Sequence, residues 1–162
     1  MTTKHLKYKN ATRKTLSLIE QLRVIASESQ MRAKHCAALV YNNKIIAITA
    51  NEYGKNINSL SIHAEQNLHK KYLKIKHKLK TRRKYELWVF RFSTASGIMN
   101  SKPCANCTKF IRNKMEYINK VCYSYNDKYY ICEDPSKLKT KHISVGHQHQ
   151  QKTNRLKRKC NC

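Results

Sequence analysis

The stretch YELWVFRFS, Tyr85–Ser93, is the most apolar and aromatic run of this 162-residue chain. Aromatic and β-branched side chains favour extended structure, and the run has the length of a single strand. We therefore predict a central β-strand here and place the other elements on either side of it.

The segment before this strand contains a predicted hairpin and two predicted helices. The apolar runs CAALVY (36–41) and KIIAITA (44–50) flank an Asn-Asn pair, and asparagine tolerates the positive φ that a tight turn needs. Apolar residues recur at helical spacing between Leu16 and Met31, which predicts a first helix. A second helix is expected from about residue 61 or 63 to about Leu79, after a polar loop at 51–59.

The segment after the central strand repeats the helix-then-strand order. Pro103 suits the first position of a helix, which we predict from about Cys104 to Lys114. The runs INKVCYSYN (118–126) and KYYIC (128–132) predict two further strands. The order α-β-β-α-β-α-β-β predicts an α/β fold, a three-layer α/β/α sandwich around a mixed sheet of about five strands.

Composition divides the chain into three parts. We predict a basic N-terminal lead-in at 1–14, one domain at 15–134 and a basic C-terminal tail at 135–162, which contains no acidic residue. The whole chain has 34 Lys plus Arg against 9 Asp plus Glu, a formal net charge of +25. Such a field favours polyanionic partners, so we expect a nucleotide or a nucleic acid. Lysine-rich composition is also typical of a merely solvated surface, which stays open as the alternative.

The cysteines and the apolar runs indicate an intracellular protein, cytoplasmic or nuclear. The seven cysteines are an odd number and the N-terminal segment has no apolar core, so we expect reduced thiols rather than a disulfide framework or secretion. No run of about 18 apolar residues is present, so we expect no membrane span.

Two short stretches at predicted helix starts carry the chemistry. In SKPCANC (101–107), Cys104 and Cys107 are spaced i, i+3 on one helix face, where the helix dipole favours thiolates. Alone, this spacing also fits a redox pair or two packed thiols. In SIHAEQNL (61–68), His63 offers a third ligand if the two helix starts meet. Two thiolates and one imidazole suit Zn²⁺ far better than Mg²⁺ or Ca²⁺, and three protein ligands leave one tetrahedral position open.

Glu65 completes this predicted site. Two thiolates neutralise the charge of Zn²⁺ and weaken its effect on the pKa of a water molecule, so a nearby base becomes useful. Glu65 lies two positions from His63 in the same helix start and can take a proton from water and pass it to departing ammonia.

The combination of His-x-Glu, at His63–Glu65, with Pro-Cys-x-x-Cys, at Pro103–Cys107, resembles the zinc-dependent cytidine and deoxycytidylate deaminase superfamily. The resemblance covers roughly residues 25–131. The stretches SKPCANC (101–107) and INKVCYSYND (118–127) are similar to deaminase-like proteins of microbial eukaryotes and large DNA viruses. It implies His63, Cys104 and Cys107 as zinc ligands and Glu65 as the general acid and base. It also implies a substrate-sugar contact for Asn51, for which a loop-start cap is the alternative.

The chain departs from the family pattern at two places. Lys102 stands where many members have glutamate before the Pro-Cys pair, and Thr49 and Ala50 stand where many have a glycine before the strand-end asparagine. Neither departure changes the predicted zinc ligands. The identity of the substrate does not follow from the resemblance.

The resemblance implies a zinc-dependent hydrolytic deaminase of a cytosine or adenine base in a nucleotide or nucleic acid. The alternative is a non-catalytic structural or nucleic-acid-binding protein with the same fold, for example a virion component; a homo-oligomer or a larger assembly such as a virion is compatible with either. A structural zinc site closed by Cys122 or Cys132 is a further alternative, although these thiols and Cys36 fit plain packed strand residues. The tail stretches GHQHQ (146–150) and CNC (160–162) could bind a second metal or have no such role.

Overall fold

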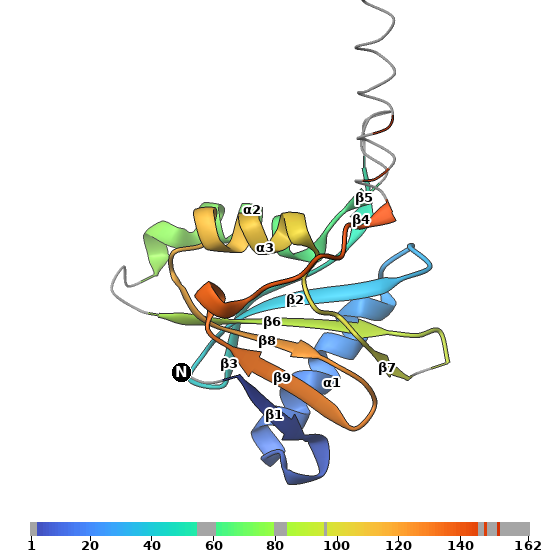
Figure 1. Cartoon of the computed structure of the whole chain (residues 1–162). Coiled ribbons are helices and arrows are strands. Elements are labelled where there is room, and N and C mark those ends of the chain that lie inside the picture. Colours follow the sequence, from blue (N-terminus) through green and yellow to red (C-terminus); the bar gives the residue numbers. More distant parts are fainter. Residues whose placement is uncertain are drawn as a thin grey trace, which may run out of the picture.

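The computed structural model describes residues 3–54, 61–79, 84–95 and 97–145, together with residues 148 and 152. Its centre is a mixed sheet with the strand order β1-β9-β8-β6-β2-β3, and β7 pairs with β6 (Figure 1). The strands of this sheet are β1 (Lys4–Lys7), β2 (Lys34–Tyr41), β3 (Lys44–Ala50), β6 (Tyr85–Phe92), β7 (Ile98–Met99), β8 (Ile118–Ser124) and β9 (Tyr129–Glu133). A separate two-stranded pair consists of β4 (Glu52–Tyr53) and β5 (Ser61–Ile62).

The helices are α1 (Arg13–Ser27), α2 (Ala64–Ile75) and α3 (Ala105–Lys114), with short 3₁₀ turns η1 (Tyr8–Asn10), η2 (Lys76–Lys78) and η3 (Pro135–Lys137). Strand β6 is central, as predicted: it pairs antiparallel with β2 and parallel with β8. The parallel pair is connected through α3, the helix crossover that parallel neighbours require. This connection brings the start of α3 to the same end of the sheet as the end of β6.

The predicted hairpin is confirmed in its turn geometry. Strands β2 and β3 pair antiparallel with Tyr41 opposite Lys44, and Asn42 and Asn43 have φ values of 48° and 60°. Positive φ at both central positions is the conformation for which asparagine is suited.

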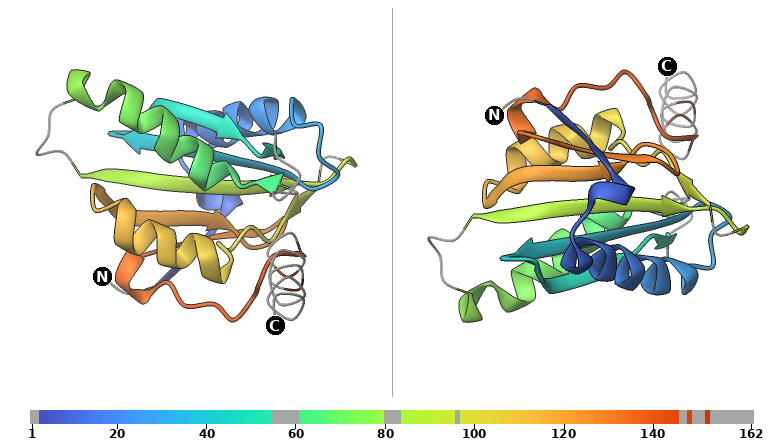
Figure 2. Two further views of the ribbon diagram at one scale, coloured as in Figure 1. Left: turned by 90° about the horizontal axis from the view of Figure 1, so that it is seen from above. Right: turned by 90° about the horizontal axis from the view of Figure 1, so that it is seen from below.

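Two apolar layers hold the helices on opposite faces of the sheet (Figures 1 and 2). On one face, Leu22 of α1 packs with Ala38 and Phe90. On the other face, Leu68 of α2 and Ile111 of α3 pack in a second cluster. The predicted three-layer α/β/α sandwich is therefore confirmed, but the described sheet has seven strands rather than about five, because β1 and the short β7 were not predicted.

The ends of the chain carry more structure than composition indicated. Residues 4–7 of the predicted lead-in form the edge strand β1 against β9. In the predicted tail, Leu138 is fully buried in the core, and the Ala105 N–H donates a 2.8 Å hydrogen bond to the His142 carbonyl. The segment after Asp134 thus begins by packing on the domain. The tail stretches suggested for a second metal, at 146–150 and 160–162, lie outside the described residues except for Gln148.

The expectation of reduced thiols is wrong for one pair. Cys122 of β8 and Cys132 of β9 lie opposite each other in the antiparallel ladder and form a disulfide, with Cα atoms 4.1 Å apart. Odd cysteine counts argue against a disulfide framework but do not exclude one cross-strand bond, and strand register was not available from the sequence. In the described part of the chain, no helix is long and apolar enough to cross a membrane.

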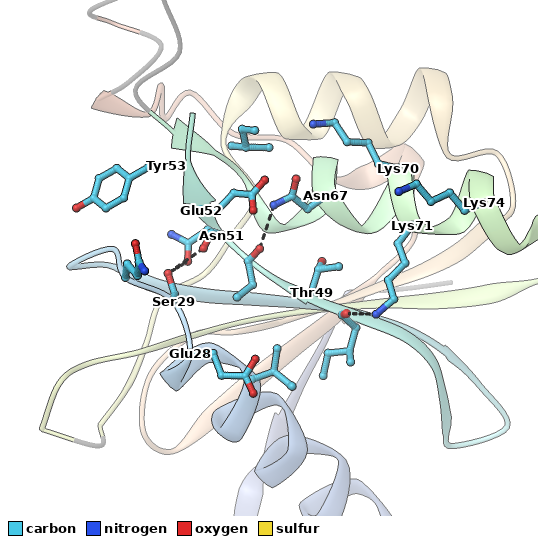
Figure 3. Close-up of a pocket in the computed structure, with 15 residues that line it drawn as sticks. Glu28, Ser29, Thr49, Asn51, Glu52, Tyr53, Asn67, Lys70, Lys71 and Lys74 are labelled. Atoms are coloured by element: carbon cyan, nitrogen blue, oxygen red, sulfur yellow. Dashed lines mark hydrogen bonds between the residues drawn. The ribbon is translucent and has the colours of Figure 1, made fainter. Parts of the chain in front are cut away.

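A groove of about 1290 Å³ follows the edge strand β3 between the end of α1 and the outer side of α2 (Figure 3). Its lining includes Lys70, Lys71 and Lys74 from α2 and Asn51 after β3.

Candidate metal centre

The centre lies where two helix starts meet, as predicted. His63 is the residue that immediately precedes α2, and Cys104 immediately precedes α3. Both have extended φ and ψ, the usual conformation of an N-cap, which turns their side chains into the space in front of the helix. The Cys104 sulfur accepts a hydrogen bond of 3.5 Å from the Cys107 N–H, so the first turn of α3 fixes both thiols.

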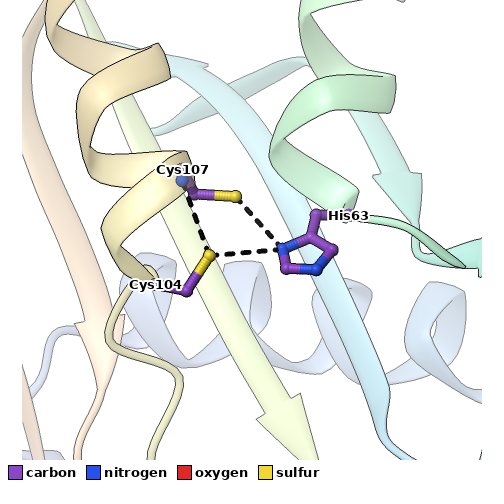
Figure 4. Close-up of side chains that lie close together, drawn as sticks. All are labelled: His63, Cys104 and Cys107. Carbon is purple, nitrogen blue, oxygen red and sulfur yellow. Dashed lines mark hydrogen bonds between the residues drawn. The ribbon is translucent and has the colours of Figure 1, made fainter. Parts of the chain in front are cut away.

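The three predicted ligands converge (Figure 4). The ligand atoms of His63, Cys104 and Cys107 all lie within 4.8 Å of one another. The His63 Nδ1 atom is 3.1 Å from the Cys107 sulfur and 3.7 Å from the Cys104 sulfur. All three donors therefore surround one point and form a possible zinc site.

The electrostatics of the cluster favour negative charge on one of the two sulfurs, that of Cys104. A hydrogen bond from the Cys107 thiol, followed by one from His63, lowers the pKa of Cys104 to about 3. The same Cys104–Cys107 hydrogen bond and burial raise the pKa of Cys107, so Cys107 is the thiol that keeps its proton when Cys104 ionises. The hydrogen bond with Cys104 raises the pKa of His63. Thiolate and imidazole are the forms of these groups that bind a metal.

Glu65 lies beside the ligands in the first turn of α2. Its side chain is buried, with only 4% exposed, and burial raises the pKa of its carboxyl. A side-chain hydrogen bond connects it with Cys107, and the charge of His63 acts on it. A buried carboxyl with a raised pKa in contact with a metal ligand has the properties of a general acid and base.

Hydrogen bonds from the sheet hold both helix starts in place. The Thr49 hydroxyl of β3 donates to the Ala64 carbonyl at the start of α2 (3.0 Å). Ahead of α3, the buried Ser101 hydroxyl donates to the Val89 carbonyl (2.6 Å) and accepts from the Ser124 N–H (2.9 Å). Ser101 and Ser124 were not predicted, because two serines 23 positions apart form no recognisable pattern unless the strand register is known.

The donor set fits zinc with one position open. Two sulfurs and one imidazole nitrogen are zinc ligands, and catalytic zinc sites have three protein ligands. The alternative of a site closed by Cys122 or Cys132 is wrong: these two sulfurs are bonded to each other within the apolar cluster under α1, on the opposite face of the sheet. In the described part of the chain, the cluster of His63, Cys104 and Cys107 is the group of three that could hold a metal ion.

The side-chain amide of Asn51 is held by hydrogen bonds from within the protein and is not part of the ligand cluster. Its Oδ1 accepts from the Ser29 hydroxyl (2.8 Å) and the His35 N–H (3.0 Å). Its Nδ2 donates to the Ala33 carbonyl (2.7 Å) and lies 3.3 Å from the Met31 sulfur. The loop between α1 and β2 thus occupies the side-chain amide, and a sugar contact would have to replace one of these bonds.

Two further residues lie near the centre, His35, which the sequence analysis did not name, and Lys102, which it named only as a departure from the family pattern. Burial, followed by the charges of Arg91 and His63, lowers the pKa of His35 on β2 to about 4, so its imidazole is neutral near pH 7. Lys102 stands where many family members have glutamate; its ammonium lies 4.0 Å from the buried Glu133 carboxylate of β9. The same carboxylate accepts a 2.9 Å hydrogen bond from the Tyr123 hydroxyl, so it balances the charge of Lys102 on the strand side.

The fold and the His-Cys-Cys cluster together define an α/β protein with a zinc site at two helix starts. A family model described as the cytidine and deoxycytidylate deaminase zinc-binding region matches residues 12–125, and the chain therefore belongs to this family, whose cofactor is zinc. A comparison with curated proteins gave no match.

Among solved structures, the chain is similar to cytidine deaminase from Burkholderia pseudomallei, with 16% identity and a TM-score of 0.58 over 82% of this chain and all of that one (100%). It is also similar to dCMP deaminase from cyanophage S-TIM5. The apo form matches with 20% identity and a TM-score of 0.48 over 70% of this chain and 84% of that one. The form in complex with dCMP and dUMP matches with 19% identity and a TM-score of 0.47 over 70% and 83%. At these identities, the first likeness supports the fold alone.

Proposed function

We propose that the chain is a zinc-dependent hydrolytic deaminase acting on a cytosine or adenine base in a nucleotide or nucleic acid. The observation that carries this proposal is the convergence of His63, Cys104 and Cys107 within 4.8 Å beside a buried Glu65. In the reaction, water adds at C4 of cytosine or C6 of adenine, the carbon–nitrogen bond breaks, and ammonia leaves as a carbonyl replaces the amino group.

Three residues would hold the metal, and one would move the protons. Zinc bound by His63, Cys104 and Cys107 supplies a Lewis acid that makes water at the open position easier to deprotonate. Glu65 accepts that proton on its carboxylate and delivers it to the amino nitrogen that departs. Its burial and raised pKa keep the proton available for this second transfer.

For Asn51 we propose the positioning role rather than the sugar contact. Its amide holds the loop before β2 through Ser29 and His35, so it shapes the pocket wall without a free hydrogen-bonding group for a ligand. A substitution there should alter substrate binding through the loop.

The test is ammonia release from cytidine, dCMP, adenosine and single-stranded oligonucleotides, with zinc content measured on the same samples. Glu65→Gln keeps the shape of the side chain and removes its proton transfer, so turnover should fall by about 10²- to 10⁴-fold with zinc retained. Glu116→Gln, at an exposed glutamate, is the matched control and should behave like the wild type. Turnover that survives Glu65→Gln would refute the mechanism. A zinc-loaded wild type that releases no ammonia from any of these bases would instead favour the non-catalytic binding protein.

A further inference from the structure

One side of the groove along α2 carries a row of three lysines. Lys70, Lys71 and Lys74 are exposed and line the groove from one side (Figure 3). Lys70 and Lys74 are spaced i, i+4 and are neighbours on the helix surface, where like charges repel, and Lys71 lies beside them. Only the Lys71 ammonium has a described partner, the Ile48 carbonyl of β3 at 3.0 Å.

None of the ion pairs recorded in the described part of the chain joins this row to a carboxylate. The described residues include the ion pairs Arg23–Glu20, Lys102–Glu133 and Lys120–Glu86, and none of these three involves a groove lysine. The acidic residue of α2 is Glu65, which is buried in the metal centre. Glu28 and Glu52 also line the groove, but they come from the end of α1 and from β4 rather than from α2. The lysine side of the groove therefore favours an anionic ligand from outside the chain.

The groove passes the start of α2, next to the metal centre, and the lysine row lies further along the helix. Ile62, which precedes His63, and Asn67, in the second turn of α2, both line the groove. With a rise of 1.5 Å per residue, Lys70 to Lys74 lie about 9 to 15 Å along the axis from the start of α2. A free mononucleotide with its base at the centre has a single phosphate group, whereas a polynucleotide has one phosphate for each residue along such a path.

The size of the groove and the lysines on the α3 side of the metal centre both favour an extended ligand. At about 1290 Å³ the groove is larger than the roughly 300–1,000 Å³ typical of small-molecule pockets. On the α3 side, the bond between Ala105 and His142 holds a segment that carries the exposed Lys139 and Lys141. Cations thus flank the centre on both sides.

We infer that the groove lined by Lys70, Lys71 and Lys74 binds the sugar-phosphate backbone of a single-stranded polynucleotide and directs one of its bases to the metal centre. This inference rests on the proposed deaminase function for the fate of the base. It deepens that function by assigning a polynucleotide, rather than a free nucleotide, as the substrate.

The experiment compares two triple variants of the full-length zinc-loaded chain. Lys70→Gln/Lys71→Gln/Lys74→Gln removes the groove charges, and Lys9→Gln/Lys14→Gln/Lys128→Gln removes three exposed charges elsewhere. Binding of a fluorescent single-stranded deoxycytidine oligonucleotide of about ten nucleotides is measured between about 50 and 200 mM salt. Ammonia release is measured on the same oligonucleotide and on cytidine, which has no phosphate. Circular dichroism checks that both variants fold.

Three lost phosphate contacts should flatten the slope of log affinity against log salt by about 2, because each contact on a single strand contributes about 0.7. The groove variant should also lose at least about tenfold more kcat/KM on the oligonucleotide than on cytidine, while the control variant keeps the wild-type slope. Equal slopes in the two variants, or equal losses on oligonucleotide and cytidine, would overturn the inference. Deamination by a groove variant with an unchanged slope would leave the enzyme function standing and refute the groove. A changed slope in a protein without any deaminase activity would leave the binding surface and refute the enzyme.

Discussion

The two faces of the sheet use cysteine for different purposes. Under α1, Cys36, Cys122 and Cys132 are strand residues within an apolar layer, where the last two are bonded to each other. On the face with α2 and α3, Cys104 and Cys107 occupy a helix start. Burial raises the pKa of the Cys36 thiol, whereas hydrogen bonds from Cys107 and His63 lower the pKa of Cys104 to about 3.

The contrast shows that placement, rather than the number of thiols, decides which of them can bind a metal. A thiol in a strand interior meets apolar neighbours, which disfavour its charged form. A thiol at a helix start meets backbone N–H groups and the positive end of the helix dipole. Here it also meets His63 from a second helix start, 3.7 Å from the Cys104 sulfur. The predictions below test this division of the molecule.

The largest effect should come from exchanging one buried cysteine on each face for alanine. Cys107→Ala removes a proposed ligand, so zinc affinity should fall by more than the 10- to 100-fold that loss of an outer-shell partner costs. Cys36→Ala, the matched control, removes a thiol of similar burial from the α1 face and should retain full zinc. Zinc per chain after dialysis against a chelator gives the answer. Equal retention of zinc by both variants would show that the helix-start thiols are not the ligands.

The next effect concerns the disulfide and should be confined to stability. The bond between Cys122 and Cys132 closes a short loop, with a sequence separation of 10 residues. The double variant Cys122→Ala/Cys132→Ala should therefore lower the free energy of unfolding by roughly 2.5–3 kcal/mol in urea titrations. A phosphine reductant should bring the wild type down to the same level, with zinc content preserved in both. Detection of seven free thiols in the unfolded, unreduced protein would show that the bond does not form.

Much of the fold and the ligand set could be predicted from the sequence because both rest on local signals. The run around Trp88, the Asn42-Asn43 turn and the Pro103 helix start each identify an element from a few adjacent residues. The order of elements allowed the two helix starts to meet at one end of the sheet, and the structure shows that they do, which brings His63 to the thiols.

The remaining features depend on which strands lie side by side, and a short sequence pattern does not specify this. Opposition of Cys122 and Cys132 follows from the register of β8 and β9. The partners of Asn51 come from a loop about twenty residues earlier in the chain. Leu138 looked like an isolated apolar residue in a basic tail, yet the core leaves it no exposed surface. In each case, a distant segment supplies the physical reason.

The smallest predicted effect tests whether the metal face depends on the sheet for its geometry. Ser101 is buried, with 3% of its surface exposed, and its hydroxyl joins the Val89 carbonyl to the Ser124 N–H three residues before Cys104. Ser101→Ala leaves these buried groups without this partner, which should cost about 1–3 kcal/mol of unfolding free energy. Ser27→Ala, at an exposed serine of α1, should stay within about 0.5 kcal/mol of the wild type.

The second measurement on Ser101→Ala separates position from stability. If the Ser101 bonds set where Cys104 stands, zinc affinity should also fall, although by less than in Cys107→Ala, because all three ligands remain. The double variant of the disulfide loses at least as much stability on the other face and should keep its zinc, so it serves as the comparison. A Ser101→Ala protein that is destabilised but binds zinc as tightly as the wild type would mean that the helix start positions its own thiols. In that case, the first turn of α3, fixed by the bond from the Cys107 N–H to the Cys104 sulfur, is sufficient to build the sulfur half of the centre.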